Sequence, residues 1–137
     1  PAGSILLGKK DFIKEAHIWR KRLGGGMRQV GILAAAGLMA LEEGPKRLHE
    51  DHENAKRLAE GLAQIPGISI DVEKVSTNIV IFDISGSGKS SADIVGSLGL
   101  LGVLAVGFGN QIRMVTHLDI SAENIKETLS AFSNVIS

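Results

Sequence analysis

The stretch Trp19-Arg-Lys-Arg-Leu-Gly-Gly-Gly-Met-Arg-Gln29 decides how the first part of this chain folds. Four cations flank its three consecutive glycines: Arg20, Lys21, Arg22 and Arg28. Because glycine loses more conformational freedom on folding than any other residue, three in a row interrupt regular structure. One interpretation is a glycine cap that ends a helix, with the cations complementing the negative end of the helix dipole. The other is a backbone that closely approaches an anion held between the cations.

The residues before the glycines predict a strand followed by a helix. Ser4–Leu7 is a short apolar run that is typical of a strand. The helix opens at Lys9 or Lys10 and ends near Leu23, because its apolar positions recur at helical spacing. A strand at the start of a chain needs neighbours to pair with. Since the sequence also begins without methionine, we expect this chain to be part of a longer protein.

Two further helices are predicted after the glycines. The first runs from about Met27 to Glu43, and its centre is apolar nearly all round, which indicates burial on more than one side. Gly44-Pro45 should end it, and Pro45 should start the next helix, which reaches about residue 64. The inner side of that helix is predicted to carry Leu48, His52, Ala55, Leu58, Ala59 and Leu62. Small residues of the first helix would let another helix or a second subunit pack closely: Gly31, Ala34, Ala35 and Gly37.

From residue 66 onward the pattern changes to α+β. The predicted elements are strands Ile68–Val72 and Asn78–Ile84, a helix Ser91–Leu101, extended pieces Val103–Val106 and Gln111–Thr116, and a helix from Ser121 to about Val135. The fold class is therefore α/β, with helices followed by a small mixed or antiparallel sheet that has helices on one face. We predict three parts: residues 1–45 with a strand and two helices, a long bridging helix over 46–65, and a small α/β domain over 66–137.

The composition of the 137 residues is that of an ordinary globular protein, with 44% hydrophobic and 22% charged residues. A net charge of zero argues against a nucleic acid or an anionic membrane as partner. The absence of cysteine excludes disulfides and thiolate zinc sites, and it is compatible with the cytoplasmic location that we expect. No apolar run has the length that a membrane-spanning helix needs.

Two short motifs resemble functional sites but do not meet their requirements. Gly86–Ser90 resembles the end of a phosphate-binding loop, which requires a glycine five residues before its last glycine. That position is Asp83, whose carboxylate would repel phosphate, so a solvated turn before a helix is predicted. His49 and His52 lie one helical turn apart, but no third ligand is suggested nearby, and zinc sites need three or four. We therefore predict no metal site.

Arg113 is the strongest single candidate for a binding residue. The strand Gln111–Val115 places Ile112 and Met114 on one face and Arg113 on the other. Burying an arginine in an otherwise apolar strand costs free energy unless an anion pairs with it. The planar guanidinium matches a carboxylate, which can belong to a bound ligand or to an Asp or Glu of the same domain. The residues by themselves leave both interpretations open.

Three stretches together resemble the C-terminal portion of low-specificity L-threonine aldolases, which are pyridoxal-phosphate lyases of fold type I. They are Pro1-Ala-Gly-Ser-Ile-Leu-Leu-Gly8, Arg20-Lys-Arg-Leu-Gly-Gly-Gly-Met-Arg-Gln29 with Ala34-Ala-Ala-Gly37, and Ile112-Arg-Met-Val-Thr-His117; Glu50-Asp-His-Glu-Asn-Ala55 and Thr77-Asn-Ile-Val80 add support. The resemblance covers essentially the whole chain in order. It implies that residues 1–45 end the large cofactor-binding domain of such an enzyme.

The resemblance also implies a reaction, the cleavage of L-threonine or L-allo-threonine to glycine and acetaldehyde by a homotetramer with pyridoxal phosphate. In this family the lysine that forms a Schiff base with the cofactor lies a few residues before the stretch that matches Pro1. Lys9 and Lys10 follow that stretch, so they do not substitute for it. We therefore expect the missing N-terminal part to be a required partner that binds most of the cofactor, and we expect this chain alone to be inactive.

By the same resemblance, Arg113 binds the substrate carboxylate, Lys21 lies near the substrate and Arg28 lies near the cofactor phosphate. Lys21 and Arg28 can serve the site of their own subunit or that of a neighbouring subunit. Two alternatives stay open: a non-catalytic assembly or interaction module, and part of another fold type I lyase. A pure scaffold has no use for three convergent cations, which argues against the first alternative.

Overall fold

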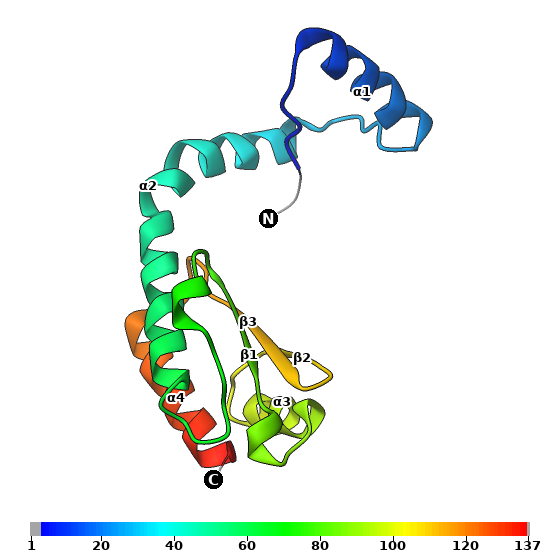
Figure 1. Ribbon diagram of the computed structural model, residues 1–137. Coiled ribbons are helices and arrows are strands. Elements are labelled where there is room, and N and C mark those ends of the chain that lie inside the picture. Colours follow the sequence, from blue (N-terminus) through cyan, green and yellow to red (C-terminus); the bar gives the residue numbers. More distant parts are fainter. Residues whose placement is uncertain (1–3, 137) are drawn as a thin grey trace. The chain divides into compact units, whose positions relative to one another are not determined.

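The computed structural model describes residues 4–136, and the chain divides into two compact units between Lys46 and Arg47. The first unit holds α1 (Lys10–Arg22) and the beginning of α2 (Gly31–Leu62). The second unit holds the rest of α2 and all later elements, coloured from green to red in Figure 1. These are β1 (Ile79–Asp83), α3 (Ser91–Leu100), β2 (Val106–Phe108), β3 (Gln111–Val115) and α4 (Ala122–Ile136), with short 3-10 turns at Val72–Lys74 and Ser85–Ser87.

The glycine run ends α1 in the way that the capping interpretation predicts. Gly24 has a left-handed φ of 81°, and its N–H donates to the carbonyl of Lys21 at 3.2 Å. The N–H of Gly25 donates to the carbonyl of Arg20 at 2.8 Å. This pair of hydrogen bonds is a Schellman motif, and the basic residues of the last turn complement the helix dipole. The cap is confirmed, and it leaves the side chains of the cations available for other contacts.

The first unit has no core of its own within the described residues. Between residues 4 and 46 no side chain is buried, and four residues are half-buried: Ile13, Ala16, Gly37 and Gly44. The predicted strand Ser4–Leu7 is wrong, because residues 4–9 have no regular secondary structure. A strand is stable only when another strand pairs with its backbone. The described part of this unit contains no strand that could do so.

Helix α2 runs without interruption for 32 residues through Gly44 and Pro45, so the predicted break at this dipeptide is wrong. An internal proline removes one backbone hydrogen bond and costs about 3 kcal/mol or more. The later part of α2 offsets this cost because it buries Ala55, Leu58, Ala59 and Leu62 in the core of the second unit.

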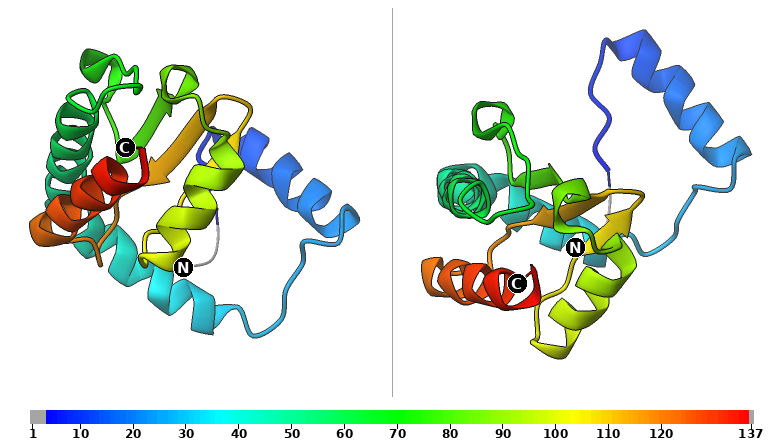
Figure 2. Two further views of the ribbon diagram at one scale, coloured as in Figure 1. Left: turned by 90° about the horizontal axis from the view of Figure 1, so that it is seen from below. Right: turned by 60° about the horizontal axis from the view of Figure 1, so that its bottom comes forward.

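The second unit is built on a three-stranded antiparallel sheet with the order β1-β3-β2. Val80, Phe82, Ile112 and Met114 alternate with exposed positions, so they all lie on one face of the sheet. Buried residues of three helices complete the same hydrophobic cluster: Ala55, Leu58, Ala59 and Leu62 of α2, Ile94 and Leu98 of α3, and Ile125, Ala131 and Phe132 of α4. The helices therefore cover one face and leave the other open, as predicted (Figure 2).

Two predicted extended segments pair less than expected. Ile68–Val72 is not a strand: only Ser69 pairs with Asp83, through backbone hydrogen bonds of 2.8 and 2.9 Å. The chain then turns, and a Lys74–Asp71 ion pair of 2.9 Å lies across the turn. Of the extended piece Val103–Val106, only its last residue belongs to a strand.

The helices α3 and α4 both begin with side-chain caps. Ser90 accepts a hydrogen bond from the backbone N–H of Asp93, so the residues that resembled a phosphate loop form a turn before α3, as predicted. Ser121 and Asn124 exchange hydrogen bonds at the start of α4, with distances of 3.0 and 3.2 Å. Asn124 takes the third helical position of a capping box, where glutamate or glutamine is usual. None of the helices found between residues 4 and 136 has the length and apolar character needed to cross a membrane.

Candidate functional site

Arg113 lies at the centre of the open face of the sheet. In the middle strand β3 it pairs with Ile81 of β1 on one side and with Val106 of β2 on the other. The same face carries further apolar side chains that are between 38% and 45% exposed: Ile79, Phe108 and Val115. Strand alternation thus places one cation in an apolar surface, as the sequence predicts.

Arg113 is half-buried, and its guanidinium makes no hydrogen bond or ion pair to any residue of the described range 4–136. The alternative of a pair with a carboxylate of the same domain is therefore not realised among these residues. Apolar neighbours lower the effective dielectric around the group, which strengthens its attraction for an anion. A carboxylate can be bound here by two parallel N–H···O hydrogen bonds.

Asp83 is the one acidic residue in the three strands, and its charge is satisfied locally. Its Oδ1 accepts hydrogen bonds from the hydroxyl of Ser85 and, at 2.8 Å, from the backbone N–H of Ser85. Both hydrogen bonds lower the pKa of Asp83 below its ordinary value, and the one from the Ser85 hydroxyl has the larger effect. Asp83 is thus held by Ser85 and makes no ion pair with Arg113.

Replacing Ser85 by alanine is expected to raise the pKa of Asp83 part of the way to 3.8, because the backbone N–H at position 85 still donates. In the native protein the lowered pKa contributes stability above the pKa of the unfolded state. This contribution to stability is lost as the pH falls through the pKa that Asp83 has in the folded protein. Ser85→Ala should make the contribution smaller. Carbon-13 NMR titration of the side-chain carboxyl between about pH 2 and 6 measures the shift. Asp71, whose pKa is lowered by Lys74, is the internal control; an unchanged Asp83 would contradict the assignment.

Lys21 and Arg28 both belong to the first unit, whereas Arg113 belongs to the second. Lys21 lies in the last turn of α1, and its side chain packs closely over Gly26: a Cβ atom added to that glycine would lie 2.9 Å from the Lys21 Cδ. Arg28 is exposed in the loop before α2, next to Gln29, whose left-handed φ of 54° is rare for a residue with a side chain. Within residues 4–136 neither cation has a hydrogen bond or ion pair.

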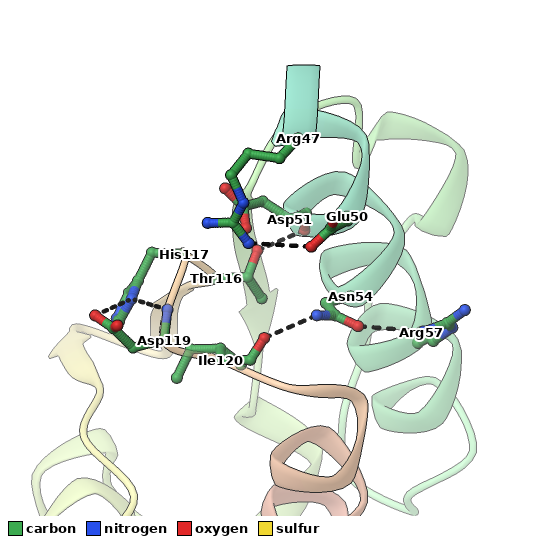
Figure 3. Close-up of polar contacts among 9 residues, drawn as sticks. All are labelled: Arg47, Glu50, Asp51, Asn54, Arg57, Thr116, His117, Asp119 and Ile120. Carbon is green, nitrogen blue, oxygen red and sulfur yellow. Dashed lines mark hydrogen bonds and ion pairs between the residues drawn. The ribbon is translucent and has the colours of Figure 1, made fainter. Parts of the chain in front are cut away.

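Four buried polar residues of the described range were not predicted from the sequence: Asp51, Asn54, Ser91 and Thr116. The prediction placed Leu48 and His52 on the inner side of the helix, but both are exposed. Asp51 and Asn54 are buried in their place because polar groups of the segment after β3 contact this side of α2, as Figure 3 shows. Asp51 lies four residues before Ala55, and Asn54 lies four residues before Leu58, which places them on the same side of the helix. Because both residues are polar, the sequence suggested instead that they lie on the exposed side.

Histidine, aspartate and glutamate side chains are the candidate ligands of a metal ion in this chain. Among the described side chains, no group of three or more could hold a metal ion. The Nδ1 of His117 accepts a hydrogen bond from the backbone N–H of Asp119 at 3.3 Å, which shapes the turn after β3. Lys89 of the glycine-rich turn donates to the carbonyl of Val135 near the end of α4.

Comparison with known proteins assigns the chain to a family. The family model of beta-eliminating lyases matches residues 1–85. The chain is 41% identical over 138 residues to low-specificity L-threonine aldolase 1 of Arabidopsis thaliana, an alignment that covers 99% of this chain and 38% of that protein. It is 42% identical over 127 residues to the low specificity L-threonine aldolase of Escherichia coli (strain K12), with 93% and 36% covered.

A further relative is alanine racemase TOXG of Cochliobolus carbonum, 30% identical over 145 residues, with 99% of this chain and 36% of that protein covered. The chain spans less than two fifths of the length of these curated relatives. Since the family model matches well over half of its residues, this chain belongs to the beta-eliminating lyase family.

Proposed function

We propose that this chain is the C-terminal region of a pyridoxal-phosphate-dependent aldehyde-lyase that cleaves L-threonine and L-allo-threonine to glycine and acetaldehyde. The similarity to threonine aldolases along 93–99% of the chain supports this function. The observation that carries it is the half-buried residue Arg113, whose guanidinium has no anionic partner in residues 4–136 and which lies in an apolar sheet face.

Arg113 is the residue that we assign to the substrate. Its guanidinium would bind the α-carboxylate of the amino acid and thereby fix the rotation of the Cα–Cβ bond relative to the reacting centre. The apolar side chains of Ile81 and Val106 would limit the access of water to this contact. Orientation of this kind lowers the barrier because the reacting bond is already aligned when the reaction starts.

Pyridoxal phosphate, when bound, supplies an electron sink for the pair released as the Cα–Cβ bond breaks. The donor set of the first unit fits the phosphate of this cofactor. Arg28 presents a guanidinium, and Lys21 an ammonium, that no described residue neutralises. We assign Arg28 to the phosphate and Lys21 to the substrate side.

The test is a product assay on a polypeptide that also includes the segment expected to carry the cofactor-bonding lysine. With L-threonine and pyridoxal phosphate, we expect equal amounts of glycine and acetaldehyde. Formation of 2-oxobutanoate and ammonia would identify a different lyase of the same family. Alanine is tested as a second substrate because one relative is named an alanine racemase. Interconversion of D- and L-alanine would favour a racemase.

We also propose that the first unit is covered by other protein, both the rest of such an enzyme and further copies in a tetramer. Its helix segment Gly31–Leu41 carries Ile32, Leu38, Met39 and Leu41 with between 56% and 80% of their surface exposed. Exposed apolar surface of this extent is typical of an interface. Light scattering after size-exclusion chromatography measures the assembly, and a monodisperse monomer would contradict it. A cytoplasmic location stays a prediction.

A further inference from the structure

The segment that follows β3 is fastened to α2 by buried hydrogen bonds, which we call the Thr116 clamp. It consists of Thr116, Asn78, Asn54 and the backbone carbonyls of Asp51 and Ile120. Thr116 is 1% exposed and Asn54 is 7% exposed, so water does not compete for these contacts. Figure 3 shows the hydroxyl of Thr116 and the amide of Asn54 at two successive contacts between the segment and the helix.

The first contact ties the end of β3 to the helix. The hydroxyl of Thr116 donates to the carbonyl of Asp51 at 2.6 Å, across a separation of 65 residues in the sequence. That carbonyl lies inside α2, where it already accepts the ordinary hydrogen bond of the helix. Removal of the hydroxyl therefore leaves no buried acceptor without a donor, and the fold should tolerate it.

The second contact fixes the pairing of β3 with β1. The N–H of Thr116 donates to the carbonyl of Asn78 at 2.9 Å, and the side-chain amide of Asn78 donates to the carbonyl of Thr116 at 2.8 Å. This closed pair follows directly on the last strand pair, Ile79 with Val115. Because a slip of one residue would turn Arg113 to the core face, the pair also fixes the side to which the guanidinium points.

The third contact holds the chain beyond Thr116. The amide of Asn54 donates to the carbonyl of Ile120 at 2.9 Å and accepts from Arg57 at 3.3 Å. Arg57 is in turn paired with Glu53 at 3.3 Å, so the amide is oriented from the helix side. The segment is thus attached to α2 on both sides of the turn after β3 (Figure 3).

We propose that Thr116 is a positioning residue for Arg113, with Asn54 in a supporting role. Arg113 lies in the same strand that Thr116 ends, and the alternation of β3 directs Thr116 to the helices and Arg113 to the open face. A carboxylate bound by two parallel hydrogen bonds needs the guanidinium plane in one orientation, so a loosened strand end should weaken binding. This inference rests on the proposed function.

The test is Thr116→Val in the full-length lyase, because valine keeps the side-chain volume and removes the hydroxyl. We expect KM for L-threonine to rise about 3- to 10-fold, the effect of one lost hydrogen bond, with a smaller change in kcat. Thr116→Ser should restore KM to within about 2-fold of the original value, because it restores the donor. The matched control is Thr128→Val, which removes a half-buried hydroxyl of α4 that has no hydrogen bond within residues 4–136.

A double-mutant cycle with Arg113→Ala separates positioning from general destabilisation. If Thr116 acts through Arg113, Thr116→Val should change kcat/KM little once Arg113 is alanine. An undiminished effect in that background, or an unchanged KM in the single variant, overturns the inference. If Thr116→Val does not fold, Asn54→Ala is measured in the same cycle with the same criteria. An Arg113→Ala enzyme with normal kinetics overturns the assignment of Arg113 to the substrate and this inference with it, whereas a damaged one with normal Thr116→Val overturns the inference alone. The proposed function itself fails only if the product assay yields no glycine and acetaldehyde from L-threonine.

Discussion

Arg113→Ala in the full-length lyase is expected to lower kcat/KM for L-threonine by about 2–4 kcal/mol, or roughly 30- to 1000-fold. Both constants should suffer: KM should rise because the α-carboxylate loses its partner, and kcat should fall because the bound amino acid is no longer aligned. Steady-state kinetics with an alcohol-dehydrogenase assay for acetaldehyde measures both constants.

Two further variants make this result specific to the guanidinium. Arg113→Lys keeps the charge but not the planar pair of donors, so its activity should lie between those of the original enzyme and Arg113→Ala. Arg47→Ala is the control: it removes a half-buried arginine of α2 whose ion pair with the exposed Glu50, at 3.0 Å, contributes little. Near-normal kinetics of Arg113→Ala would defeat the assignment of the substrate carboxylate to this residue.

Phe132→Ala is expected to destabilise the second unit by about 3–5 kcal/mol, the usual cost of removing a fully buried aromatic side chain. Phe132 of α4 is 0% exposed and meets Phe82 of β1 edge to face, with 5.5 Å between ring centroids and 73° between planes. The substitution removes this contact and opens a cavity between the sheet and the helix. Such a loss is a large fraction of the total stability of a domain.

Urea unfolding followed by far-ultraviolet circular dichroism measures the change. Tryptophan fluorescence is unsuitable because the single tryptophan, Trp19, belongs to the first unit. Phe108→Ala is the matched control, since this phenylalanine lies on the open face with 44% of its surface exposed and should cost less than about 1 kcal/mol. Equal midpoints for the two variants would show that the buried pair is not part of the stable core.

The face of the sheet on which Arg113 lies was predicted correctly from the sequence because strand alternation is a local property. A residue between Ile112 and Met114 must lie on the face opposite to theirs, whichever strands lie beside it. The end of α1 was equally local, because a left-handed glycine after a helix satisfies the carbonyls of the last turn. Both features depend on residues a few positions apart.

The failures have a common cause in partners that are distant in sequence. Gly44-Pro45 is a helix-breaking signal, but α2 continues through it because residues of its later part pack against the sheet. Ser4–Leu7 and Ile68–Val72 have the composition of strands, yet a strand exists only where a neighbour pairs with it. His52 and Asn54 differ in burial because of the segment after β3, which no periodicity of the helix reveals.

The amino-acid sequence was enough to indicate the family, the order of most elements, a small mixed or antiparallel sheet with helices on one face, and the side of the sheet on which Arg113 lies. The structure shows that the sheet is antiparallel. Two features became apparent only in the folded chain: this guanidinium has no carboxylate partner among residues 4–136, and Thr116 and Asn54 attach its strand to α2. The reason is the sequence separation of the residues involved. Backbone periodicity depends on residues that are close together in the sequence. A buried hydrogen bond between residues 65 positions apart exists only after the core has brought its two groups together.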